Sequence, residues 1–256
     1  MDYNKIIDIV LKTNEIVFNK QLQNSVMIKG DCDYLTAVDV SISNYLKEEL
    51  YKIDPIVSFM SEEDNNGKIE GKKWILDPID GTTNLVYNYN LSSVSLAYYD
   101  GINVKFGVVY NPFTNELFYA IRGEGAFYNG KKLENVKDRP LKECLIEFGA
   151  GTSIKQYATQ TFELAKQVFV DCLDLRRMCS SALAICYIAS GKLNGYFERS
   201  LYPWDYAAAY LILSECGGIV TDFDGNKLQF DKKSSIVCGS PTAHKYLLEQ
   251  IEKYAK

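Results

Sequence analysis

The chain has 256 residues, of which 47% are hydrophobic and 24% are charged. This composition is typical of a folded globular protein of one large or two modest domains, and it excludes a disordered, fibrous or low-complexity chain. The net charge of −5 excludes a broad cationic face, so we expect no direct nucleic-acid partner.

The first quarter of the chain combines helical and strand patterns. Apolar residues at helical spacing predict two helices, at about 3–20 and 38–52, packed on one side of a sheet. Two short apolar runs, Ile56–Ser61 and Trp74–Asp77, predict strands that end in carboxylates. Functional groups often lie at such strand ends.

Three further strands are predicted at Ser92–Tyr99, Val104–Tyr110 and Glu116–Ile121. Asp100-Gly101 stands between the first two and predicts a hairpin turn. We therefore expect the first half of the chain to be an α+β unit.

After about residue 140 strands and helices alternate. The predicted strands are Cys144–Phe148, Cys172–Met178, Gly195–Arg199 and Ser235–Cys238, and the predicted helices are 155–168, 181–190, 204–215 and 241–255. We expect a layered α/β (α+β) body, with residues 1–140 as one half and 141–256 as an α/β second half.

The stretch WILDPIDGTTN, residues 74–84, carries the clearest chemical signal. A strand would deliver Asp77 to its end, Pro78 would block further ladder pairing, and Asp80 would follow before a tight glycine turn. The two carboxylates and the carbonyl of Ile79 could then converge. Hard oxygen donors at this density suit Mg²⁺ or Mn²⁺ rather than zinc.

Gly81, Thr82 and Thr83 follow directly and offer backbone N–H groups and two hydroxyls, as an opening helical turn presents to an anion. Cations on one side and oriented amides on the other indicate a phosphate site. The alternative is structural only: Asp80 forms an Asx turn and Thr82 caps a helix.

Acidic residues also follow two other predicted elements. Glu62, Glu63 and Asp64 come directly after a strand, and Asp205 lies at a helix start. Taken alone, the first group could belong to a solvated loop and Asp205 could be a helix cap. Trp204 and an alanine run flank Asp205, however, and predict a buried helix terminus where a carboxylate requires a partner.

The cysteines and the single histidine exclude several kinds of chemistry. We interpret the seven cysteines, which form no C-x-x-C pair, as buried free thiols of a cytoplasmic protein. We expect His244 to be a surface or capping residue, which sets aside Ser-His-Asp and Cys-His hydrolases and His-rich zinc sites. No apolar run approaches the roughly 20 residues that span a bilayer. The cysteines are Cys32, Cys144, Cys172, Cys179, Cys186, Cys216 and Cys238.

Four motifs together carry a resemblance to a known family. Glu62-Glu63, the octapeptide DPIDGTTN at 77–84, Trp204-Asp205 and Gly217-Gly218 resemble, in order and spacing, the signatures of the inositol monophosphatase family. This family belongs to the magnesium-dependent, lithium-sensitive phosphatases, and the resemblance covers almost the whole chain. It implies a layered α-β-α-β-α sandwich, which agrees with the elements predicted above.

The resemblance also implies a ligand set for two or three Mg²⁺ ions, with Mn²⁺ as an alternative. Glu62, Asp77 and the carbonyl of Ile79 match the ligands of the first ion. Asp77, Asp80 and Asp205 match those of the second, with Asp77 bridging, and a third, weaker ion would use Glu62 and water.

Further catalytic positions follow from the same resemblance. The stretch from Asp33 to Asp39 resembles the family's early D-x-x-T-x-x-D pattern. It implies that Asp39 and Thr82 orient the attacking water, with Glu62 as a third catalytic residue. Without the resemblance, Asp39 would be interpreted as a helix N-cap.

Recognition of the substrate is implied at the phosphate-binding turn Gly81–Thr83 and in the second half of the chain. Glu198 matches the family acid that accepts hydrogen bonds from a polyol hydroxyl; alternatively it is a rim charge. Ser181 and Ala182 match substrate-binding positions, whereas Ser180 stands where the family usually has glycine. Residues 149–153 fall where family loops approach the substrate.

The implied reaction is Mg²⁺-dependent hydrolysis of a small phosphomonoester by activated water, first of all inositol monophosphate, in a Li⁺-sensitive homodimer. Fructose 1,6-bisphosphate and the 2′-phosphate of NADP(H) are alternative substrates, and 3′-phosphoadenosine 5′-phosphate has less support. An alternative of another class is a non-catalytic regulatory binding protein, because some bacterial relatives associate with the transcription machinery independently of catalysis.

Overall fold

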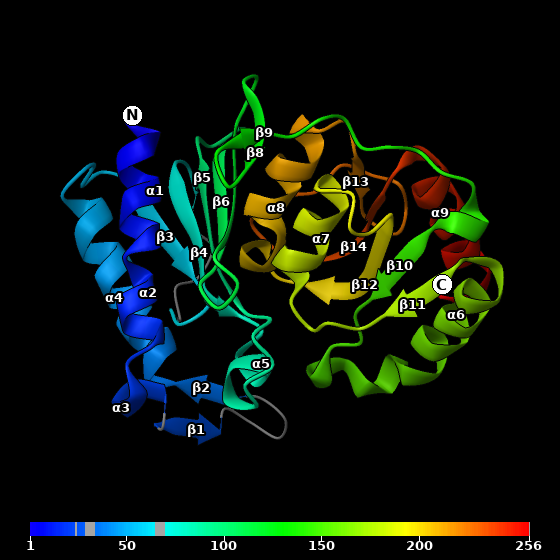
Figure 1. Ribbon diagram of the computed structural model, residues 1–256, viewed down its shortest axis with the longest axis horizontal. Helices are drawn as coiled ribbons and strands as arrows, with labels where there is room; N and C mark the ends of the chain where they lie inside the picture. Colours follow the sequence, from blue (N-terminus) through cyan, green and yellow to red (C-terminus); the bar gives the residue numbers. More distant parts are fainter. Residues whose placement is uncertain (24, 29–33, 65–69, 256) are drawn as a thin grey trace.

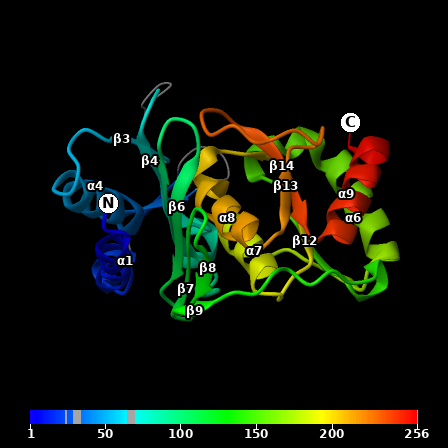
Figure 2. The same cartoon turned by 90° about the horizontal axis from the view of Figure 1, so that it is seen from above.

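The elements form five layers, in the order helices, sheet, helices, sheet, helices (Figures 1 and 2). The computed structural model describes residues 1–23, 25–28, 34–64 and 70–255. This architecture confirms the predicted α-β-α-β-α sandwich.

The first helix layer covers one face of a seven-stranded sheet (Figure 2). It contains α1 (Tyr3–Leu11), α2 (Thr13–Val17), α3 (Lys20–Gln23) and α4 (Ala37–Tyr51), and β1 (Val26–Ile28) and β2 (Tyr34–Thr36) pair beside it. The two predicted helices therefore pack as expected, but the first is broken. The hydroxyl of Thr13 donates to the carbonyl of Val10 over 2.6 Å, a local bond that competes with the helical ladder.

The seven-stranded sheet has its strands in chain order, with β3 and β4 parallel and the other neighbours antiparallel. Its strands are β3 (Ser58–Ser61), β4 (Lys73–Asp80), β5 (Ser93–Tyr99), β6 (Val104–Asn111), β7 (Glu116–Ile121), β8 (Gly125–Tyr128) and β9 (Lys131–Lys132). The predicted hairpin at Asp100-Gly101 is confirmed, whereas β8 and β9 were not predicted.

One prediction about β4 is wrong. Asp77 was expected at the end of this strand, but the strand continues to Asp80. Asp77 pairs with Ser95 and Asp80 pairs with Ser93, so two residues of β4 lie opposite one residue of β5. Pro78 has no N–H to donate, and the sheet accommodates it with this bulge instead of ending.

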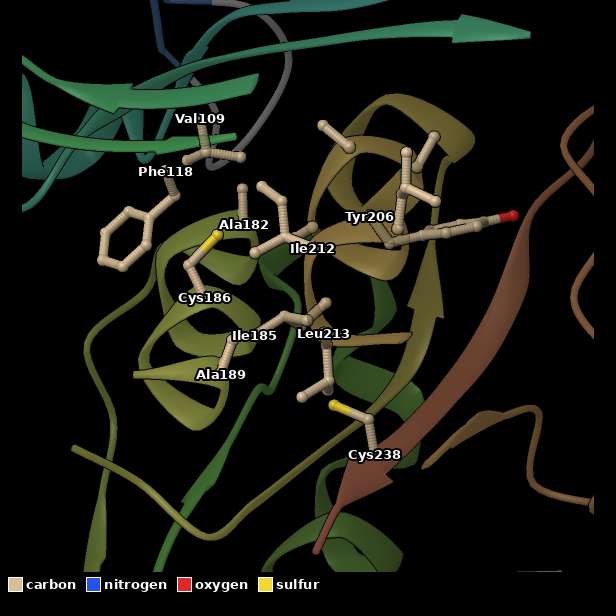
Figure 3. Packing of buried hydrophobic residues seen from close by; sticks show 14 of the residues in the cluster. Val109, Phe118, Ala182, Ile185, Cys186, Ala189, Tyr206, Ile212, Leu213 and Cys238 are labelled. Atoms are coloured by element: carbon tan, nitrogen blue, oxygen red, sulfur yellow. The ribbon is translucent and has the colours of Figure 1, made fainter. Parts of the chain in front are cut away.

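The middle layer consists of α7 (Ser181–Ala189) and α8 (Pro203–Glu215), which lie between the two sheets. In Figure 3, Ile212 and Cys186 of these helices face the side of Val109 and Phe118, while Cys238 of the second sheet lies on the other side. Because apolar residues surround α8, it has no solvent-facing stripe.

The second sheet has the strand order β11-β10-β12-β14-β13 and is parallel only around β10. Its strands are β10 (Leu145–Phe148), β11 (Asp174–Arg176), β12 (Gly195–Leu201), β13 (Ile219–Thr221) and β14 (Ser234–Gly239). The outer helices are α6 (Ala158–Asp171) and α9 (Pro241–Tyr254), preceded by the 3-10 turns η1 (Leu141–Glu143) and η2 (Thr152–Tyr157). The division of the chain near residue 140 stays a prediction.

Two predictions about single residues are wrong. His244 is buried, and its ring Nε2 lies 2.9 Å from the hydroxyl of Thr221, so it is neither a surface nor a capping residue. Cys179 is exposed, whereas the other described cysteines are buried as expected. Cys32 lies outside the described residues. No helix in the described part of the chain is long and apolar enough to cross a membrane.

Candidate functional site

A cavity of about 270 Å³ lies where both halves of the chain meet, at the ends of β4 and β10, beside the first half of β12 and at the starts of α5 (Thr82–Val86), α7 and α8. The predicted site residues in its lining are Glu62, Asp77, Ile79, Asp80, Gly81, Thr82, Thr83, Ser181, Glu198 and Asp205. Two predicted residues, Asp39 and Ala182, are buried outside this lining.

Four carboxyl groups that line the cavity, those of Glu62, Asp77, Asp80 and Asp205, repel one another. Burial raises the pKa of Asp77 well above its usual value, and the charges of Glu62, Asp80 and Asp205 raise it further. The pKa of Asp205 is raised by burial and by the charges of Asp80 and Glu62. A bound cation would relieve this repulsion, because an opposite charge favours ionised carboxylates.

The donor set fits Mg²⁺ by chemical type, since it consists of carboxylate oxygens and a backbone carbonyl. Within the described residues, however, no three His, Cys, Asp or Glu side chains lie close enough together to bind one metal ion as they stand. The cavity therefore brings the predicted ligands together without holding them in a finished coordination geometry.

Asp80 is held by the start of α7. Its Oδ2 accepts hydrogen bonds from the hydroxyl of Ser180 (2.5 Å) and from the N–H of Ala182 (2.9 Å), and its Oδ1 accepts from the N–H of Ser181 (3.2 Å). Burial raises the pKa of Asp80 to about 6, although these donors lower it. Asp80 thus stabilises the N-terminus of another helix instead of forming a local Asx turn.

Thr82, which lines the cavity, contacts the buried carboxyl group of Asp39. The hydroxyl of Thr82 lies 3.0 Å from the carbonyl of Ile79 and 3.3 Å from Oδ1 of Asp39. Asp39 is not the N-cap of α4, because Thr36 occupies that position and Asp39 completes a capping box with it. Burial raises the pKa of Asp39 to about 6. Asp33 lies outside the described residues.

Gly81 begins the turn that carries Thr82 and Thr83. Its φ of +90° is in the left-handed region, and it precedes the first turn of α5. Thr82 is therefore inside the helix and does not cap it.

Glu198 on β12 is buried, so the alternative of a rim charge is wrong. Its Oε2 accepts a hydrogen bond from the hydroxyl of Tyr196 and lies 3.4 Å from the hydroxyl of Ser181. Burial raises its pKa to about 7. Gly149 makes room for this carboxylate, because a Cβ at that position would lie 1.9 Å from Oε2.

The segment before α7 links the two halves of the chain. Cys179 has a φ of +61°, in the left-handed region that glycine favours, whereas Ser180 is extended. The position whose backbone favours glycine is therefore Cys179, one residue before Ser180, which stands where the family usually has glycine. The side-chain amide of Asn84 donates to the carbonyl of Met178 over 2.6 Å and anchors this segment to α5.

Four residues of the lining were not predicted at the site from the sequence: Glu147, Arg177, Cys179 and Tyr196. Among the described residues, Arg177 is the one positively charged side chain that lines the cavity. Glu147 could have been noticed as an acid within the apolar strand Cys144–Phe148, because a buried carboxyl group requires a partner. Nothing in the local pattern distinguishes Tyr196 from an ordinary core aromatic residue.

Comparisons with known proteins show which proteins this chain is similar to. The chain is 37% identical over 227 residues to "Nus factor SuhB" of Escherichia coli, covering 87% of this chain and 84% of that protein. It is 33% identical over 238 residues to an inositol-1-monophosphatase of Mesorhizobium japonicum, covering 91% of this chain and 88% of that protein. The structure of an IMPase from Thermotoga maritima superimposes with a TM-score of 0.89 at 28% identity, covering 100% of this chain and 98% of that one.

The model of one protein family matches residues 4–256, nearly the full chain, under the description "Inositol monophosphatase family". The order of the acidic motifs and the five-layered fold agree with this match. The chain belongs to the inositol monophosphatase family.

Proposed function

We propose that the protein is a Mg²⁺-dependent phosphatase that hydrolyses a small phosphorylated polyol, first of all inositol monophosphate. The observation that carries this proposal is the convergence of Glu62, Asp77, Asp80 and Asp205 on one cavity from distant parts of the chain. Hydrolysis of a phosphomonoester dianion requires positive charge beside its oxygens, and these carboxylates can hold that charge.

The metal site would be formed by Glu62, Asp77, Asp80, Asp205 and the carbonyl of Ile79. Bound Mg²⁺ would supply charge neutralisation and an activated water. The Thr82 hydroxyl can accept a hydrogen bond from that water while it donates to Asp39, so the pair can orient the water and take its proton.

The substrate's alcohol portion would lie toward Glu198, whose carboxyl group can bind a hydroxyl. The Ser181 hydroxyl lies in the same wall of the cavity. Gly81, Thr82 and Thr83, at the first turn of α5, would bind the phosphate. The backbone N–H groups of Ser181 and Ala182 already donate to Asp80, so they would act by holding that acid.

Steady-state phosphate release tests this function. We expect turnover of inositol monophosphates at millimolar Mg²⁺, loss of activity with EDTA and inhibition by Li⁺. Fructose 1,6-bisphosphate, NADP(H) and 3′-phosphoadenosine 5′-phosphate are the comparison substrates. Absence of phosphate release from every substrate at millimolar Mg²⁺ would remove the proposal.

A second candidate function is regulatory binding, favoured by the similarity to proteins named Nus factor SuhB. The variant Asp77→Asn separates the two, because it should abolish turnover without removing a docking surface. A cellular phenotype of gene deletion that this variant rescues would favour the regulatory role, and one that only the wild-type protein rescues would favour catalysis.

Assembly and location also belong to this proposal. We propose a homodimer in the cytoplasm, following the family resemblance. Light scattering coupled to size-exclusion chromatography tests the dimer: a mass of one chain across micromolar concentrations would contradict it.

A further inference from the structure

Glu147 shares a sheet face with the proposed substrate-binding acid. On the parallel strands β10 and β12, Glu147 pairs with Tyr196. Side chains alternate along a strand, so Tyr196 and Glu198 point to the same face as Glu147. All three residues line the cavity, whereas their neighbour Phe148 packs into the core on the opposite face.

The two oxygens of Glu147 have different surroundings. Oε1 accepts a hydrogen bond from the backbone N–H of Met178, with 2.9 Å between nitrogen and oxygen. Oε2 is buried and has no hydrogen-bond partner among the described residues, although the side chain is only 1% exposed. Buried polar atoms are nearly always paired in folded proteins, and Glu147 lines the cavity, so this unpaired oxygen indicates a group that a ligand supplies once a small shift of the carboxyl group opens Oε2 to the cavity.

The surroundings of Glu147 indicate which group this is. Burial raises the pKa of Glu147 to about 8, the charges of Asp80 and Glu198 raise it further, and Arg177 lowers it. A carboxyl group in this environment can donate or accept a hydrogen bond, and it does not favour an anion. A neutral hydroxyl can form a hydrogen bond with Glu147 whether its carboxyl group is protonated or ionised.

We propose that Glu147 is a specificity-determining residue that, beside Glu198, hydrogen-bonds a hydroxyl of the substrate's alcohol portion. The site then selects polyhydroxylated monophosphates over phosphates of simple aryl alcohols. This inference rests on the proposed phosphatase function, and it adds a second contact for the alcohol portion, one that the motifs in the sequence do not indicate.

Two substitutions test the inference on two substrates, inositol 1-phosphate and p-nitrophenyl phosphate. Glu147→Met keeps the length of the side chain and removes both oxygens, and we expect kcat/KM for inositol 1-phosphate to fall about tenfold or more, mainly through KM. The value for p-nitrophenyl phosphate, which has no hydroxyl at that place, should stay within about twofold. Glu147→Gln keeps polar atoms at both positions and should retain most of the activity on both.

The controls separate specificity from folding. Glu143→Gln changes an exposed acid outside the cavity and should leave both substrates unaffected. An equal loss on both substrates in Glu147→Met, or no loss on either, would overturn the inference. If the wild-type protein hydrolyses neither inositol 1-phosphate nor p-nitrophenyl phosphate, that result contradicts the proposed function itself.

A crystal structure of the wild-type protein with inositol 1-phosphate gives an answer that does not depend on how the variants fold. We expect Oε2 of Glu147 about 3 Å from a ligand hydroxyl. A bound ligand that leaves this oxygen without contact would overturn the inference, even if phosphatase activity is present.

Discussion

The hydroxyl of Thr82 joins the carboxylate of Asp39 at 3.3 Å and the carbonyl of Ile79 at 3.0 Å, so it connects α4 to the turn that carries the acids. The other oxygen of Asp39 accepts from both the N–H and the hydroxyl of Thr36, at 2.8 and 2.5 Å. Asp39 is thus oriented by its own helix cap, and the orientation of Thr82 depends on it.

Thr82→Val should lower kcat by about 100-fold or more, because it removes a hydroxyl proposed to orient the attacking water while keeping the shape of the side chain. The thermal midpoint should change by only a few degrees, since the lost bonds lie at the edge of a large core. Kinetics and thermal unfolding of the same preparation provide the measurement. Thr159→Val, on the exposed side of α6, is the matched control; an undiminished kcat in Thr82→Val would contradict the assigned role.

The metal-free protein should become less stable as the pH rises from 5 to 9. Folding raises the pKa of Asp39 and Asp80 to about 6, of Glu198 to about 7 and of Glu147 to about 8. A carboxyl group with a raised pKa favours the folded state when protonated, and this contribution is lost as the pH passes through the folded-state value. For Glu147 alone the loss is about 5 kcal/mol across its full titration.

Urea unfolding in EDTA across this pH range measures the effect. Glu147→Gln cannot titrate, so its stability should fall less steeply above pH 7 than that of the wild-type protein. A free energy of unfolding that is flat or rises between pH 5 and 9 would contradict these pKa directions.

Asp77→Asn should stabilise the metal-free protein at pH 8, because it removes a buried carboxyl group whose ionised form is repelled by Glu62, Asp80 and Asp205. The same change should remove most of the additional stability that Mg²⁺ gives the wild-type protein. Thermal unfolding with and without Mg²⁺ tests both effects, with the exposed Asp8→Asn as control. Equal stabilisation by Mg²⁺ in both variants would place the ion elsewhere.

Gly149→Ala should damage recognition of the alcohol portion. The added Cβ would lie 1.9 Å from Oε2 of Glu198, so this carboxylate would have to move away from Tyr196. We expect KM for inositol 1-phosphate to rise about tenfold. Gly151→Ala is the milder comparison, because its Cβ would first meet a side-chain carbon of Ile154 at 3.2 Å; similar KM values for both variants would argue against a role for Glu198.

Cys179→Gly should stabilise the protein by about 0.5–1 kcal/mol, because the left-handed φ of +61° costs less for glycine than for any residue with a Cβ. Cys179→Ala keeps the strained backbone and should give no such gain. Chemical denaturation of the two variants compares them directly. A gain of equal size in both would indicate that the thiol group, and not the backbone, is unfavourable.

Hydrophobic periodicity alone determined most of the elements of this protein. The helix at Ala37–Tyr51 and the strands on either side of Asp100-Gly101 appear where the pattern predicts them, because local spacing decides which face of an element is apolar. The pattern predicted one helix where the structure has a break at Thr13, whose hydroxyl bonds to the carbonyl of Val10. It also predicted that a strand ends before Pro78, which has no N–H to donate, but the strand continues through a bulge.

For the candidate site, too, the local sequence determined some features and the tertiary structure determined others. The sequence by itself determined that acids follow β3, that Asp77 belongs to β4 and that an acid opens α8, because these positions are set by neighbouring residues in the chain. Only the tertiary structure decided that Glu147 faces the cavity and that Asp80 binds the start of α7, since both contacts join segments about 30 and 100 residues apart. Burial and the charges of neighbours from distant segments then set the pKa of each acid, and no local sequence pattern contains that information.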